Sequence, residues 1–154
     1  MIDPPETDLF DPAVRTDLLR RLESVAPSSP RQWGKMDAAQ AMTHLAITME
    51  AANGTAPMRQ KWLGKILAPL VRGSVLGPKP FSRNSPTDPK FIVADPRDFA
   101  REKDRLLGAI RKFVEIGPAG AARSEHAFFG RLSGEEWGRL MAKHLDHHLR
   151  QFGA

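Results

Sequence analysis

Apolar residues recur every three or four positions along most of the chain, which is the spacing of one helix face. Asp-Pro or capping-box signals stand at the start of each such stretch, and Pro or Gly follows its end. The pattern predicts helices at about 11–26, 37–53, 95–117 and 133–152. No alternating pattern is long enough to predict a sheet. We therefore expect an all-α protein, with residues 1–154 forming a single domain that is an antiparallel four-helix bundle.

Residues 57–96, between the second and third predicted helices, do not fit one regular element, because they hold seven of the thirteen prolines. Apolar positions from Trp62 to Val71, with basic residues beside them, predict a short amphipathic helix that Pro69 bends or ends. An irregular loop follows. Residues 58–90 carry seven Lys and Arg against one Asp, a net charge of +6, so the rest of the chain supplies −1 of the total of +5. The positive net charge of the protein thus lies in residues 58–90, within this segment.

Two kinds of role are open for this basic amphipathic segment. Residues 58–90 are a candidate docking surface for an anionic membrane, a nucleic acid or a partner protein, which would make the chain a non-catalytic binding module. Alternatively, Trp62, Ile66 and Leu70 pack on the bundle as a lid or form the seam of a homodimer. We favour the packing role. Nucleic acid is disfavoured as a partner because the chain has no Tyr and few aromatic residues for base stacking.

The composition excludes several kinds of catalytic and metal-binding site. The 154 residues include no Cys, which excludes disulfides, thiolate-ligated metal sites and a thiol nucleophile. A metal must therefore use His, Asp or Glu. The N-terminus lacks the apolar region of a secretory signal, and no apolar run approaches the roughly 18 residues of a membrane span. These features predict a cytoplasmic protein without a transmembrane segment.

Three of the five His residues lie in the sequence HLDHH on the last predicted helix. His144 and His148 are four residues apart and share its apolar face, while His147 falls at the edge of that face. Either a divalent metal or hydrogen bonds within the core would satisfy two buried imidazoles. His44, on the second predicted helix, offers a third metal ligand. Three His ligands leave positions open for water or substrate, and we expect zinc or nickel, with iron or manganese as alternatives.

Other polar residues are candidates for catalysis or binding. Gln151 lies one turn beyond His148 and either contacts a metal ligand or water or caps the helix end, which we favour. His126 is either a proton carrier or a turn residue bonded to the backbone, and we favour the turn. Arg83 and Asn84 either reach an anionic substrate or clamp the loop that carries them.

The final HLDHHLRQFG, the preceding EHAFFGRLSGEEWG and the helix around His44 resemble the DinB/YfiT-like metalloenzymes, in a subfamily of uncharacterised function. The resemblance runs from about Trp33 to the C-terminus. It implies a four-helix bundle in up-down-down-up order, with residues 57–96 as a long crossover between helices two and three. It also implies a divalent metal held by His44, His144 and His148.

The same resemblance implies a metal-dependent enzyme that acts on a small-molecule substrate, either a hydrolase or a small-molecule thiol transferase. A bound water would then be the reactive or exchangeable ligand. One departure from the family pattern is Ala127, where related sequences tend to have Pro, and it concerns the turn around His126 rather than the ligands.

Overall fold

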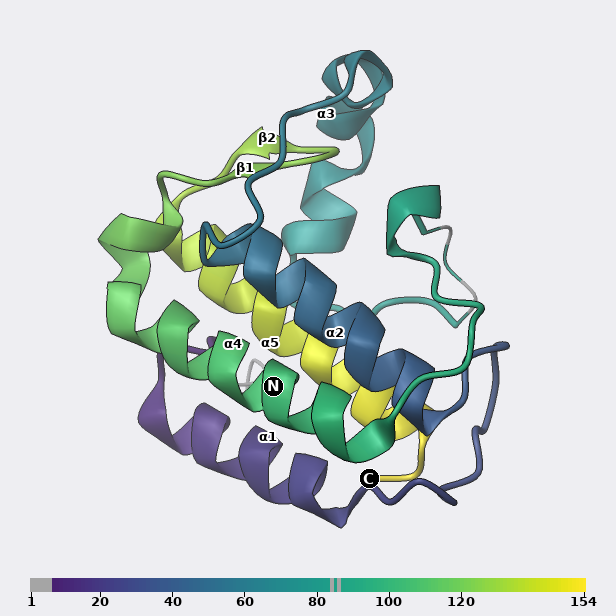
Figure 1. Ribbon diagram of the computed structural model, residues 1–154. Helices are drawn as coiled ribbons and strands as arrows, with labels where there is room; N and C mark the ends of the chain where they lie inside the picture. Colours follow the sequence, from purple (N-terminus) through teal and green to yellow (C-terminus); the bar gives the residue numbers. More distant parts are fainter. Residues whose placement is uncertain (1–6, 84, 86) are drawn as a thin grey trace, which may run out of the picture.

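The computed structural model describes residues 7–83, 85 and 87–154 (Figure 1). Its regular structure is almost entirely helical, which confirms the all-α prediction. The elements in chain order are α1 (Pro12–Ser24), α2 (Ala38–Ala52), α3 (Trp62–Leu76), the 3-10 helix η1 (Pro89–Phe91), α4 (Phe99–Ala121), β1 (Glu125–His126), β2 (Gly130–Arg131) and α5 (Gly134–Gln151). Among the described residues, no helix combines the length and the apolar character needed to cross a membrane.

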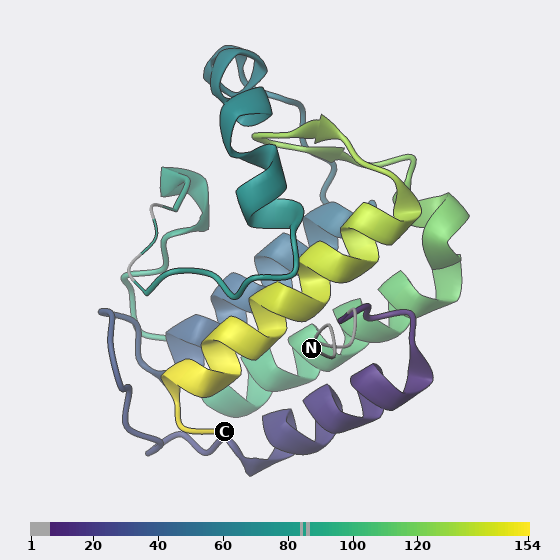
Figure 2. The ribbon, with the colours of Figure 1, turned by 180° about the vertical axis from the view of Figure 1, so that it is seen from behind.

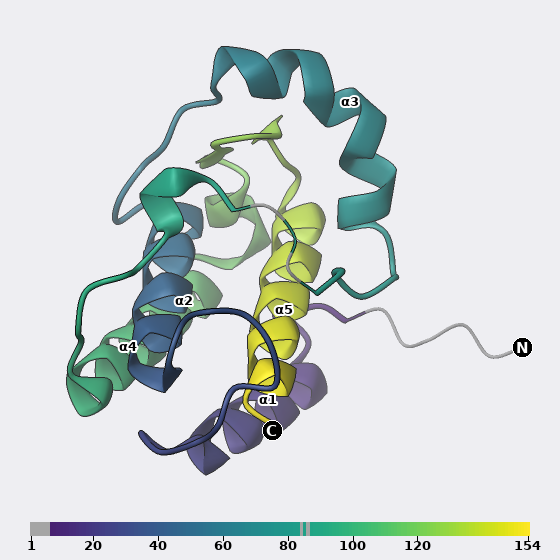
Figure 3. The same ribbon diagram turned by 90° about the vertical axis from the view of Figure 1, so that its right-hand side faces the viewer.

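Helices α1, α2, α4 and α5 gather around one core, while α3 lies across the outside of the molecule (Figures 1 and 3). Helix α2 packs against α4 and α5, and α5 also packs against α1. The largest fully buried side chains on these four helices are Trp137, Phe113, Leu22, Met42, Leu45, Met49, Leu106, Ile110 and Leu149. This shared core holds α2 and α5 side by side.

The predicted capping signals begin three of these helices. The Asp11 carboxylate accepts hydrogen bonds from the N–H groups of the first turn of α1. Asp37 with Gln40, and Ser133 with Glu136, form reciprocal capping boxes at the starts of α2 and α5. Each cap satisfies backbone N–H groups that have no partner within the helix. The starts of α1, α2 and α5 therefore agree with the sequence to within one or two residues.

Helix α4 differs from its prediction at both ends. It begins at Phe99 rather than near residue 95, because the Asp98 side chain accepts a hydrogen bond from Arg101 N at 2.9 Å and caps the helix there. At the predicted stop, Gly117 has φ +66° and ψ −177°, outside the helical region, yet helical turns resume and reach Ala121. The helix is thus kinked rather than ended at Gly117-Pro118, since Pro is well accommodated in the first turn of the resumed segment.

Helix α3 continues past Pro69 and ends only at Leu76. The side of α3 that packs against the rest of the protein carries the small residues Gly64 and Ala68. Gly64 lies so close to the backbone carbonyl of Phe128 that a Cβ atom would not fit between them. Ala68, one turn further along α3, is also buried. The favoured packing of Trp62, Ile66 and Leu70 on the bundle is wrong, because these side chains are 72%, 61% and 80% exposed. Their alternative role in a homodimer seam stays a prediction.

Strands β1 and β2 form a short antiparallel hairpin between α4 and α5, with Glu125 opposite Arg131. Gly130 at its end has φ +72°, a backbone conformation that favours glycine. The sequence pattern did not predict this hairpin, because strands of two residues show no alternation. It supports the start of α3, where Lys61 N donates to Ala127 O at 2.9 Å.

Candidate metal centre

The structure brings His44, from α2, together with His144 and His148, one turn apart on α5. The three ring centroids are 4.9, 4.8 and 4.8 Å apart in pairs. One ligand nitrogen of each imidazole lies within 4.8 Å of the others, a spacing that could hold one metal ion. His44 and His148 are buried and His144 is partly buried. We call these three residues the histidine cluster.

A backbone carbonyl from the crossover fixes the ring of His44. His44 Nδ1 lies 2.7 Å from Phe91 O, the last residue of η1. Because a carbonyl oxygen can only accept, Nδ1 carries the proton and Nε2 of the neutral ring keeps its lone pair. The crossover thus orients a residue of the bundle and leaves its Nε2 available as a ligand.

Thr48, one turn beyond His44 on α2, fixes the ring of His144. Its hydroxyl donates to Leu45 O at 3.0 Å, so its oxygen is left to accept from His144 Nδ1 at 3.2 Å. The remaining nitrogen of His144, Nε2, is then unprotonated in the neutral ring. The sequence signal for Thr48 was its i,i+4 spacing from His44, which places both on one face of α2; the sequence-based reasoning missed it.

Gln151 orients His148 through a chain of two hydrogen bonds. The Gln151 amide nitrogen donates to Trp33 O at 2.9 Å, which turns its oxygen toward His148 Nδ1 at 2.7 Å. His148 Nδ1 therefore donates, and Nε2 is its available ligand atom. The sequence analysis favoured a helix-capping role for Gln151 over contact with a metal ligand. The structure shows the contact with the candidate ligand His148.

The three imidazoles therefore offer one unprotonated Nε2 each, and two of these atoms face each other. His44 Nε2 and His144 Nε2 are 3.0 Å apart, a distance at which two acceptors need a proton or a cation between them. Burial lowers the pKa of all three rings, that of His148 to about 3 and that of His144 well below the usual 6.5. A proton is thus weakly held here at neutral pH. The donor set fits a divalent metal, because neutral imidazole with its second nitrogen bonded to a fixed oxygen is the form in which His ligates metals.

Aromatic side chains from two loop segments lie beside the cluster and its neighbour His147. Phe81, from the crossover, is 6.5 Å from the His144 ring and 5.9 Å from the His147 ring. Trp33 lies 5.5 Å from the His147 ring, and the Arg83 guanidinium lies 4.4 Å from the Trp33 ring. Arg83 therefore clamps its loop against Trp33, while Asn84 lies outside the described residues. His147 is not part of the histidine cluster.

His126 is the last residue of β1, next to the β1–β2 turn, and is not in the cluster either. Its Nδ1 accepts from Phe128 N at 3.0 Å and from Phe129 N at 3.1 Å, the backbone contacts that the sequence favoured. Burial lowers the pKa of His126 to about 4. A role for His126 in carrying protons stays a prediction.

The chain matches one known family over nearly all of its length. No curated protein and no solved structure matches it. The family described as "Protein of unknown function (DUF1569)" matches residues 12–154, which include α1 through α5 and the whole histidine cluster. Because this match spans well over half of the 154 residues, the protein belongs to the DUF1569 family.

Proposed function

We propose that this protein is a divalent-metal-dependent enzyme whose ion is held by His44, His144 and His148. One observation carries the proposal: the three Nδ1 atoms are each paired with a fixed oxygen, on Phe91, Thr48 and Gln151. That arrangement leaves three Nε2 atoms for one ion and matches the oxygen partners that orient His ligands in metal sites.

The proposed chemistry is that of a hydrolase or of a small-molecule thiol transferase, as the resemblance to DinB/YfiT-like metalloenzymes implies. A divalent ion on three imidazoles, with open positions, polarises a bound water, thiol or substrate oxygen. The chain's own part is to keep the rings neutral and in place. The up-down-down-up order of the bundle belongs to the same proposal, as do zinc or nickel as the ion, with iron or manganese as alternatives.

Elemental analysis of protein purified without a His tag tests the metal site. We expect about one ion per chain, and its loss in His44→Ala, His144→Ala and His148→Ala. His147→Ala is the matched control, because His147 lies next to His148 in sequence but outside the cluster. Circular dichroism checks that each variant is folded. Full metal content in the His144→Ala plus His148→Ala variant would refute the site.

Catalysis is tested separately from metal binding. Wild-type protein is assayed for hydrolysis of activated esters and for transfer of small thiols to electrophiles, as purified, after chelation and after restoring the metal. We expect activity that disappears with the chelator, returns with the metal and is absent from His144→Ala. Turnover that stays at the level of the protein as purified, both after chelation and in His144→Ala, would overturn the enzymatic proposal without affecting the evidence for the metal site.

A further inference from the structure

The large apolar residues of α3 between Trp62 and Val71 face away from the molecule. Trp62, Ile66 and Leu70, one turn apart, form the most exposed row. At 100° per residue, the exposed apolar side chains cover about half of the helix circumference. The six are Trp62, Leu63, Ile66, Leu67, Leu70 and Val71. A continuous exposed apolar patch of this kind marks an interaction surface in soluble domains.

The opposite face of α3 is fixed to the rest of the protein. The Arg72 guanidinium donates to the Glu136 carboxylate of α5 at 2.7 and 2.8 Å. The Lys143 ammonium of α5 binds the carbonyls of Val75 and Gly77, where α3 ends. Figure 2 shows this end of α3 descending onto α5. The apolar face is therefore presented by a helix that is already folded and anchored.

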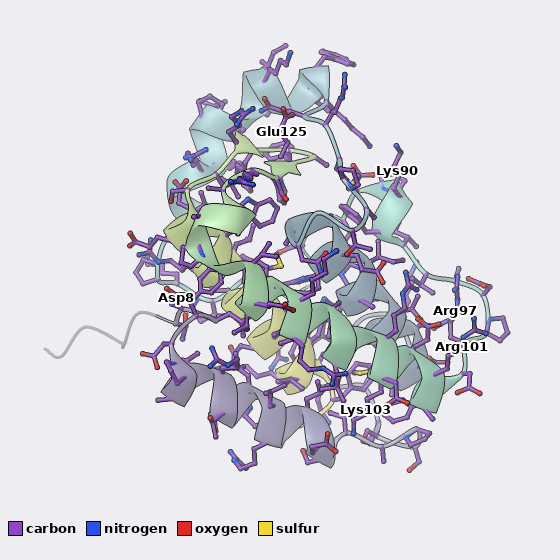
Figure 4. The ribbon with its side chains drawn as sticks, turned by 60° about the vertical axis from the view of Figure 1, so that its left-hand side comes forward. Asp8, Lys90, Arg97, Arg101, Lys103 and Glu125 are labelled. Carbon is purple, nitrogen blue, oxygen red and sulfur yellow. The ribbon has the colours of Figure 1, made fainter. Side chains whose placement is uncertain are left out.

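The charged side chains carried by α3 and the residues next to it are all positive. Residues 58–79 contain five Lys and Arg and no Asp or Glu. Of these, Arg59, Lys65 and Lys79 are exposed and form no ion pair within the part of the chain that the structure describes. Glu125, on the hairpin near α3 (Figure 4), directs its carboxylate to Gln60 N at 3.2 Å. Exposed cations without an ion pair to the described residues thus lie on α3 itself, at Lys65, and just before and after the helix, at Arg59 and Lys79.

We propose that α3 docks this protein on an anionic lipid membrane, with the helix lying in the plane of the interface. An apolar half that includes Trp, opposite a face whose charged residues are Lys and Arg, is the pattern of helices that insert one face among lipid headgroups. The apolar side chains would leave water for the acyl boundary, while the free cations would meet lipid phosphates. This proposal is independent of the metal site.

Charge favours a membrane over a second copy of the chain as the occupant of this face. A two-fold dimer through α3 would set the same surface against itself and would bring two all-basic segments together. An anionic bilayer offers the opposite charge across its whole surface. A second copy is therefore an outcome of the test below rather than part of the proposal.

Co-sedimentation with lipid vesicles tests the proposal directly. We expect the wild-type protein to bind vesicles that contain about 30% phosphatidylglycerol in phosphatidylcholine, and to bind pure phosphatidylcholine far less. Raising the salt from about 0.1 M to about 0.5 M should weaken binding, because the lipid contacts are partly electrostatic. Trp62 emission should shift to the blue on binding. Trp62→Phe should bind similarly but without that shift, which assigns the signal to α3.

Charge substitutions locate the surface. Ile66→Glu with Leu70→Glu should reduce binding about a hundredfold or more, and Lys65→Glu about tenfold. Ile92→Glu is the matched control, since Ile92 is 59% exposed but lies after η1 rather than on α3. Lys35→Glu, in the loop that joins α1 to α2 at the other end of the molecule (Figure 3), is the control for charge.

Two results would overturn the proposal. One is a wild-type protein that does not bind anionic vesicles but sediments as a dimer that Ile66→Glu dissociates, which would assign α3 to a second copy. The other is an equal loss of vesicle binding in Ile92→Glu and in the α3 variants, which would remove the surface from α3. Circular dichroism identifies unfolded variants, and Lys65→Glu, a change at an exposed position, keeps the test decisive if the double variant unfolds.

Discussion

Acid should destabilise the protein through His126, whose partly buried ring is held as a neutral acceptor. Its Nδ1 receives the N–H groups of Phe128 and Phe129, so a proton on Nδ1 would break both hydrogen bonds. Burial lowers the pKa of His126 from 6.5 to about 4, although the charge of Asp88 partly opposes the shift. The unfolded chain takes up this proton near pH 6.5 and the folded chain does not. The stabilisation is therefore complete above that pH and is lost as the pH falls toward 4.

The size of the effect follows from the shift. One pKa unit corresponds to about 1.4 kcal/mol, so moving from 6.5 to about 4 limits the total loss of unfolding free energy to about 3 kcal/mol. About 2 kcal/mol of this is lost between pH 7 and about pH 5, where the unfolded chain is protonated and the folded chain largely is not.

Urea unfolding of wild type and His126→Asn, with a chelator present, measures this contribution. Asn places an oxygen acceptor near the position of Nδ1 and does not titrate, so the turn keeps its hydrogen bonds. The other His residues are common to both proteins and cancel in the comparison. We expect the wild type to lose about 2 kcal/mol more than the variant between pH 7 and about pH 5. Identical losses in the two proteins would refute the assignment of a depressed pKa to His126.

Three further substitutions have defined outcomes. Gln151→Ala removes the partner of His148 Nδ1, and calorimetric metal titration should give an affinity about 10- to 100-fold weaker with unchanged stoichiometry. Gly64→Ala places a Cβ against the Phe128 carbonyl, so urea unfolding should show a loss of about 1–3 kcal/mol. Asp37→Ala removes the N-cap of α2 and should cost about 1 kcal/mol in thermal unfolding, whereas an unchanged midpoint would mean that the capping box contributes nothing.

Local signals in the sequence were sufficient for most of the helices. Capping by Asp11, Asp37 and Ser133 depends on residues within one turn, so the starts of these helices could be predicted. Near residue 95, two Asp residues compete. Asp98 caps α4 because its side chain reaches Arg101 N, whereas Asp95 pairs with Arg97. A choice between neighbouring caps depends on the path of the whole loop, which the pattern does not contain.

The orientation of α3 could not be predicted from its periodicity. An apolar stripe usually faces a core, but Gly64 permits an approach to the hairpin backbone that no larger residue allows. Tertiary packing therefore buries the side of α3 that carries the small residues and leaves the apolar stripe exposed to solvent. The hairpin that makes this contact gave no sequence signal, so the outcome depended on an element that could not be foreseen.

The spacing of His144 and His148 predicted that they share one face, and the structure brings His44, the third candidate ligand named from the sequence, beside them. The hydrogen-bond partner of each Nδ1 atom could not be predicted from the sequence. Phe91 O is a backbone atom 47 residues from His44, and no residue type marks a carbonyl for this use. Thr48 and Gln151 are each three or four residues from a cluster member, a spacing that local reasoning can weigh but not decide.

The hydrogen bond from His44 Nδ1 to Phe91 O links the histidine cluster to the position of η1 in the crossover. If η1 moved away, the His44 ring would lose the acceptor that holds its proton on Nδ1, and the ring could then turn or change tautomer. A ligand that needs His44 Nε2 is then bound only by the closed fraction of molecules, and its observed affinity falls in proportion to that fraction. By the same linkage, a ligand on the cluster slows the amide hydrogen exchange of residues 87–92, far along the chain from α2 and α5.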